Sequence, residues 1–128
     1  MITIEQLRAG VGFDSTELSD AELQEALDMA EQLAGAYCDA NGCPKAGAGY
    51  EVAVKYYARA NAYRTADAKG LKPAARASAS ESMSSDLGTA IDGFLKLAEA
   101  ALANHKKATQ SSPRDRYFKH LRGGRGAF

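Results

Sequence analysis

The chain has 128 residues and a mass of 13.5 kDa, the size of one domain with a modest core. Hydrophobic residues make up 45% of the sequence, but 26 of them are alanine, while valine and isoleucine number three each. This composition argues against a sheet of β-branched side chains and favours closely packed helices. No apolar run approaches the roughly 18 residues that span a bilayer, and Met1–Glu5 lacks the features of a signal peptide. We therefore expect a soluble protein that stays in the compartment where it is made.

A formal net charge of zero hides a gradient from an acidic start to a basic end. Residues 1–51 hold ten acidic and two basic side chains, residues 52–104 hold five acidic and seven basic, and residues 105–128 hold one acidic and seven basic. Three interpretations fit: a solvated acidic helix with a disordered basic tail, a nucleic-acid-binding arm, or complementary surfaces that meet when copies associate.

Two capping boxes mark the first two helices. Thr3 and Gln6 can bond each other's backbone, and the short helix that they open should end at Gly10 or Gly12. Ser19 and Glu22 repeat the pattern and open a long amphipathic helix over 19–41, which Gly42 and Pro44 end. Its expected apolar face consists of Leu23, Ala26, Leu27, Ala30, Leu33, Ala34, Tyr37 and Cys38, and acidic residues cover much of the opposite face.

A third helix is expected over 50–69, ending before Gly70. Four of the six tyrosines lie in residues 50–63, where their rings supply bulk that the alanines lack. We interpret this aromatic stripe as core rather than as a ligand platform. The stripe consists of Val52, Tyr56, Ala60 and Tyr63, broadened by Ala53 and Tyr57.

The last long helix should begin near Ser84 or Ser85 and run to Lys107, where positive charge suits a helix C-terminus. Its apolar stripe is the cleanest in the sequence and consists of Leu87, Ala90, Ile91, Phe94, Leu95, Ala98, Ala101 and Leu102. The residues before it, 72–85, contain strictly alternating serines and too little apolar area for a strand that is stable alone. They form either an extended, flexible loop or a strand that pairs with a neighbouring molecule.

After Pro113 the composition changes to arginine, glycine and aromatic residues. Aromatic anchors in a segment without a core suggest a flexible tail that orders on docking to a partner. We therefore divide the chain into a helical domain at 1–108 and a docking tail at 109–128.

The chain lacks an evident catalytic or metal site. Phosphate-loop, nucleophile-elbow and His-Glu-x-x-His motifs are absent, so we expect neither an enzyme nor a cofactor. Cys38 and Cys43 are interpreted as a buried thiol at a helix end and a loop thiol. A zinc site would need two further ligands, and His105 and His120 lie outside the usual short spacings, so no metal site is predicted.

The order of these elements resembles the head–tail connector, or adaptor, proteins of tailed bacteriophages. The resemblance covers about residues 2–105 and rests on Ile2–Leu7, Ser19–Asp28 leading to Ala36–Cys38, Tyr50–Val54, and Ser78–Ser85 before a last helix. It implies an all-α bundle of three long helices and a short N-terminal one. The bundles assemble as a ring, commonly of twelve copies, below the portal of the virion neck, after synthesis in the bacterial cytoplasm. DNA passes through the ring without sequence specificity, and no membrane is involved.

The resemblance also implies where partners bind. The tail would dock on the portal protein through Arg114, Arg116, Tyr117, Phe118, Leu121, Arg122 and Phe128. The segment before the last helix would face the channel or the next neck or tail-completion protein through Arg76, Ser78, Ser80, Ser82 and Ser84. The charge gradient adds an expected contact between subunits through Glu22, Glu25 and Asp28.

Two other functions remain open. The tail combines bases with Tyr117 and Phe118, as in arms that bind nucleic acid, and a DNA-packaging protein would be one version of this. The acidic first half weakens that alternative, because attraction to phosphates dominates such binding. The other alternative is a regulatory helical bundle that binds another protein.

Overall fold

The computed structural model describes residues 1–71 and 87–110, and within those ranges it contains four helices and no strand. They are α1 (Ile4–Val11), α2 (Asp20–Asn41), α3 (Ala48–Ala68) and α5 (Leu87–Gln110). The predicted all-α class is confirmed, and the last helix runs past the expected end at Lys107. The expected loop at 72–85 and tail at 109–128 fall almost wholly outside the described residues. Over the described ranges, no helix is long and apolar enough to cross a membrane.

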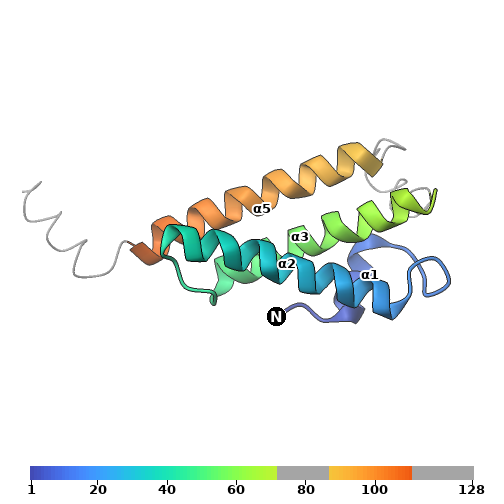
Figure 1. The fold of residues 1–128 in the computed structure, drawn as a ribbon, viewed down its shortest axis with the longest axis horizontal. Helices are drawn as coiled ribbons and strands as arrows, with labels where there is room; N and C mark the ends of the chain where they lie inside the picture. Colours follow the sequence, from blue (N-terminus) through green and yellow to red (C-terminus); the bar gives the residue numbers. More distant parts are fainter. Residues whose placement is uncertain (72–86, 111–128) are drawn as a thin grey trace, which may run out of the picture.

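The three long helices lie side by side, with α3 packed against both α2 and α5, and α1 lies at one end of the bundle (Figure 1). α2 and α5 run in the same direction and α3 runs opposite to them. The C-termini of α2 and α5 therefore lie at one end, whereas α1 and the start of α2 lie toward the other.

Both predicted capping boxes are present. Gln6 N donates to Thr3 Oγ1 at 3.2 Å, and Thr3 N donates to Gln6 Oε1 at 2.9 Å. Ser19 and Glu22 make the same two bonds, so each helix satisfies backbone donors that its first turn would leave unpaired. α1 and α2 end where backbone φ turns positive, at Gly12 and Gly42.

The burial pattern of α3 differs from the predicted stripe. Val52 was expected on the buried face but is 38% exposed, whereas Ala53 and Val54 are fully buried. Packing against α1, α2 and α5 buries more than one face of α3, because a helix between neighbours has no single apolar stripe. Its buried residues are Tyr50, Ala53, Val54, Ala58, Ala60, Asn61, Ala62, Tyr63 and Ala66.

The other two stripes are largely confirmed, since every member except Leu33 is buried or half-buried. Leu33 of α2 is 41% exposed rather than buried. Phe94 of α5 is half-buried, and its ring lies 6.1 Å from that of Tyr56 and 5.5 Å from that of Tyr63. Small residues dominate the rest of the core, which allows the helices to approach closely. The buried Asn61 Nδ2 donates to the Ala26 carbonyl at 3.1 Å and so links α3 to α2.

Candidate functional site

Most of the predicted contact residues lie outside the described part of the chain. These are the seven tail residues Arg114, Arg116, Tyr117, Phe118, Leu121, Arg122 and Phe128, and the five residues Arg76, Ser78, Ser80, Ser82 and Ser84. The three acidic candidates on α2 are described, and the structure separates them into two groups.

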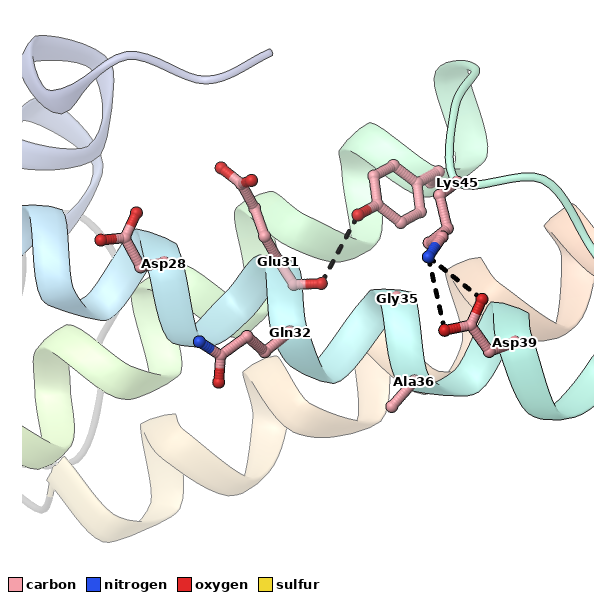
Figure 2. A pocket seen from close by; sticks show the side chains of 8 residues that line it. Asp28, Glu31, Gln32, Gly35, Ala36, Asp39 and Lys45 are labelled. Atoms are coloured by element: carbon pink, nitrogen blue, oxygen red, sulfur yellow. Dashed lines mark hydrogen bonds and ion pairs between the residues drawn. The ribbon is translucent and has the colours of Figure 1, made fainter.

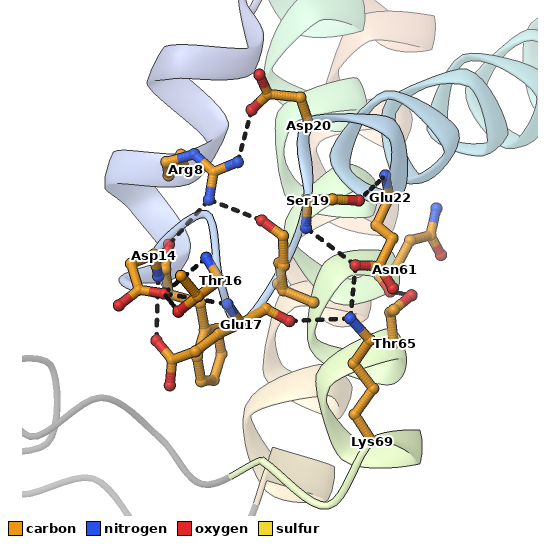
Figure 3. A network of polar contacts seen from close by, with 12 residues as sticks. Arg8, Asp14, Thr16, Glu17, Ser19, Asp20, Glu22, Asn61, Thr65 and Lys69 are labelled. Atoms are coloured by element: carbon orange, nitrogen blue, oxygen red, sulfur yellow. Dashed lines mark hydrogen bonds and ion pairs between the residues drawn. The ribbon is translucent and has the colours of Figure 1, made fainter.

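Glu22 is engaged within its own chain. Its Oε1 accepts from Ser19 N at 2.9 Å and from Lys69 Nζ at 2.5 Å (Figure 3). The ammonium of Lys69, together with the Ser19 backbone bond, lowers the pKa of the Glu22 carboxyl. Glu22 therefore joins the start of α2 to the end of α3. The predicted contact of Glu22 with a neighbouring subunit would have to compete with its bond to Lys69.

Glu25 and Asp28 are both exposed on α2. Asp28 accepts a bond from Gln24 Nε2 at 2.9 Å, one turn earlier on the same helix. Within the described ranges, neither side chain is bonded to another element, so a neighbouring molecule would have no such bond to replace, and the two are the stronger members of the predicted set.

An open groove of about 600 Å³ continues from Asp28 along α2 (Figure 2). Carboxylates predominate among its charged groups, and Lys45 Nζ lies 3.1 Å from Asp39 Oδ1. The lining residues are Asp28, Glu31, Gln32, Gly35, Ala36, Asp39, Lys45 and Tyr50. An open acidic groove of this kind suits a basic side chain from another molecule.

Gly35 and Tyr50 are the buried residues of the groove lining. The Tyr50 hydroxyl donates to the Glu31 carbonyl at 3.5 Å. Burial, and secondarily the charge of Glu31, raise the pKa of Tyr50, so its hydroxyl stays protonated as a donor. Gly35 leaves room for the stem of Lys45, since a Cβ there would lie 3.3 Å from Lys45 Cδ. These groups determine the shape of the groove, but they do not place a nucleophile beside a general base.

A second constellation lies at the end of the bundle where α2 and α5 terminate. Cys38, Cys43 and His105 are 1%, 7% and 5% exposed, and their ligand-type atoms all lie within 4.8 Å of one another. Burial, and then the neighbouring Cys43, raise the pKa of Cys38 to about 11, so Cys38 is a thiol. The spacing of the histidines in the sequence does not indicate this cluster, because helix packing brings His105 to the two cysteines.

The signal for His105 was present in the helix period. His105 lies seven residues after Ala98 and three after Leu102, both fully buried, and so continues their face. The polar residues Asn104, Lys106 and Lys107 around His105 make this continuation of the apolar stripe hard to recognise in the sequence. Both predicted interpretations of the cysteines, a buried thiol at a helix end and a thiol in the next loop, agree with their positions, although Cys43 is also buried.

Comparisons with protein-family models, curated proteins and solved structures found no match to this chain.

Proposed function

We propose that this chain is a structural subunit of a ring, the head–tail connector of a tailed-phage virion, with DNA passing through the ring. The observation that supports it most is the separation of the two ends of α5, to which the flanking segments of the chain are joined. Segment 72–86 joins the bundle between the end of α3 and the start of α5, and segment 111–128 follows the opposite end of α5 (Figure 1).

α5 separates these two attachment points by its own length. With 24 residues and a rise of about 1.5 Å per residue, it spans roughly 36 Å. A ring subunit needs contacts on two opposite faces, one toward the portal protein and one toward the next neck component. Segments that leave from opposite ends of a rigid helix suit such an arrangement.

The side of the bundle offers a third contact. Glu25, Asp28 and the acidic groove on α2 present negative charge, and the sequence after α5 is strongly basic. A repeated contact between an acidic face and a basic segment of the next copy is heterologous, and such contacts form a ring when the rotation between copies closes. Because exposed ion pairs are weak and screened by salt, we expect rings to be completed on the portal rather than in isolation.

The test combines sedimentation with electron microscopy of the full chain, alone and mixed with the portal protein of the same phage. We expect monomers or mixed species alone and rings on portals. Replacing Glu25 and Asp28 by lysine should reduce ring formation and leave helical content unchanged. Asp92→Lys is the matched control, because Asp92 is an exposed acid on α5, away from the groove.

Deletion of residues 113–128 tests the portal contact. The shortened chain should keep its helical content and fail to join portals. A chain that still joins portals after this deletion, or a tight dimer that salt does not dissociate, would contradict the proposal. Tail-dependent, salt-sensitive DNA binding by a chain that ignores portals would favour the nucleic-acid alternative.

A further inference from the structure

Three buried side chains that are far apart in sequence meet at the end of the bundle formed by the C-termini of α2 and α5. Cys38 lies in the last turns of α2, Cys43 just after that helix, and His105 near the end of α5. We propose that Cys38, Cys43 and His105 bind one zinc ion, which joins these two helix ends.

The backbone brings the two thiols together. Gly42 adopts φ +70° after α2, and both Gly42 N and Cys43 N donate to the Cys38 carbonyl, the latter at 3.1 Å. This turn reverses the chain, so that Cys43 folds back beside Cys38. Both thiols are then held by the helix end rather than by a free loop.

The spacing of the ligand atoms is close to what a tetrahedral ion requires. With Zn–S bonds of about 2.3 Å and Zn–N bonds of about 2.0 Å, ligand atoms lie roughly 3.5 to 3.8 Å apart. One ring nitrogen of His105 and the two cysteine sulfurs lie within 4.8 Å of one another. These separations therefore have to shorten by about 1 Å at most for the three atoms to share one tetrahedral ion.

The surroundings of His105 determine which ring nitrogen is available to a metal. His105 Nε2 lies 2.7 Å from the Pro44 carbonyl oxygen, which can only accept a hydrogen bond. The contact requires a proton on Nε2, so in the neutral tautomer the lone pair lies on Nδ1. A histidine ligand in proteins commonly donates its other N–H to a carbonyl or carboxylate in this manner.

Charge and ligand type favour zinc. Two thiolates and a neutral imidazole around Zn²⁺ give no net charge, which limits the cost of burying the ion. On binding, each thiol loses its proton to solvent, and the two thiolate sulfurs and the imidazole nitrogen donate lone pairs without any change of oxidation state. Sulfur and nitrogen ligands suit zinc and disfavour magnesium or calcium. A water molecule takes the fourth position.

The proposed ion would reinforce contacts that are otherwise polar and near the surface. Gln110 Nε2 donates to the Asn41 carbonyl at 2.6 Å, and Lys106 Nζ donates to Asn41 Oδ1 at 3.2 Å. These bonds link the same two helix ends as the cluster does. Zinc would therefore stabilise the end of the bundle from which residues 111–128 continue, a property independent of the proposed assembly.

The experiment uses the untagged full chain, kept reduced and freed of metal, and titrates it with Co²⁺ and then Zn²⁺. We expect one equivalent of Co²⁺ to give a thiolate-to-metal charge-transfer band and the intense visible bands of tetrahedral coordination. Zn²⁺ should displace it. Zinc should also raise the thermal midpoint in proportion to the logarithm of its concentration, and a chelator should reverse the rise.

Variants distinguish the proposed ligands from chance binding. Cys43→Ala and His105→Gln should each weaken zinc binding on the order of 100-fold, since each removes one of three protein ligands. Circular dichroism checks that they remain helical. Cys38→Ala supplies a third variant should His105→Gln fail to fold. His120→Ala is the matched control, because His120 is the only other histidine in the sequence, and it should bind zinc as the wild type does.

Three results would overturn the proposal. The first is no stoichiometric binding by the reduced chain, or octahedral cobalt spectra without a thiolate band. The second is unchanged affinity in a folded Cys43→Ala or Cys38→Ala variant, or loss of binding in His120→Ala. The third is a Cys38–Cys43 disulfide that forms in the presence of zinc and a thiol buffer, since it would consume both sulfur ligands.

Discussion

At the end of the bundle where α1 meets the start of α2, charged side chains bond backbone carbonyl groups, whereas at the opposite end two thiols and an imidazole fill the buried space. Arg8 Nη1 donates to the Leu18 carbonyl at 2.8 Å, and its Nη2 lies 2.6 Å from Asp20 Oδ1 (Figure 3). At the other end, the ligand-type atoms of Cys38, Cys43 and His105 lie within 4.8 Å of one another, and His105 Nε2 lies 2.7 Å from the Pro44 carbonyl oxygen.

The two ends also differ in the sequence range of their contacts. The bonds of Arg8 and both capping boxes join residues three to twelve positions apart. The bonds that link α5 to the end of α2 and the following loop join residues 61 to 69 positions apart. The polar bonds of the first end are thus mainly local, with those of Lys69 as a distant addition, while the polar bonds between α2 and α5 at the second end form only once α5 has packed.

The largest expected effect is at the first end, in Phe13→Ala. The Phe13 ring is 1% exposed and meets the Tyr63 ring edge-on at a centroid distance of 6.0 Å. Removal of the ring should lower the free energy of unfolding by about 3–5 kcal/mol. Urea denaturation provides the measurement. Phe94→Ala is the comparison, and its half-buried ring should cost less; an equal or greater loss at Phe94 would reverse our assignment of the core.

Arg8→Ala should have the next largest effect at the same end. It removes the donor to the Phe13 and Leu18 carbonyls, and charged hydrogen bonds of this kind are worth about 1.5–3 kcal/mol. Arg8→Met separates the bonds from the packing of the side-chain stem. If Arg8→Met unfolds at the same urea concentration as the wild type, the guanidinium does not hold this turn.

Two glycine substitutions test the close packing at the second end. A Cβ at Gly49 would lie 2.8 Å from His105 Cβ, whereas one at Gly93 would meet nothing within 4 Å. Gly49→Ala should destabilise the protein by about 1–2 kcal/mol, because α3 and α5 must move apart. Gly93→Ala should stabilise it by about 0.5–1 kcal/mol through helix propensity. Thermal unfolding of both variants would show the opposite signs; a stabilising Gly49→Ala would contradict the close contact.

The smallest effect concerns pH at the first end. Because Lys69 and Ser19 lower the pKa of Glu22 below its ordinary 4.5, the folded state favours the charged carboxylate. The resulting stability is present above 4.5 and is lost as the pH falls through the lowered pKa. Glu22→Gln should therefore flatten that part of the stability-against-pH curve, measured by urea midpoints. Glu25→Gln, at an exposed position on the same helix, is the control and should leave the curve unchanged.

Local features of the sequence predicted the helices well. Thr3 with Gln6 and Ser19 with Glu22 marked helix starts, and Gly12 and Gly42 marked helix ends, because these signals act over a few residues. The stripes of α2 and α5 were also predicted, since each of these helices buries mainly one face. The exposed positions of Glu25 and Asp28 followed from the same periodicity.

Tertiary structure alone decided the burial of α3 and the cluster at the second end. Periodicity tells which residues share a face, but not how many neighbouring helices cover the helix. The predicted stripe of α3 therefore includes Val52, which is exposed, and omits several alanines that are buried. Leu33 is exposed because α2 turns only part of its apolar stripe toward α3. His105 meets Cys38 and Cys43 through the packing of α5 beside the end of α2, a contact across more than 60 residues that no local spacing encodes.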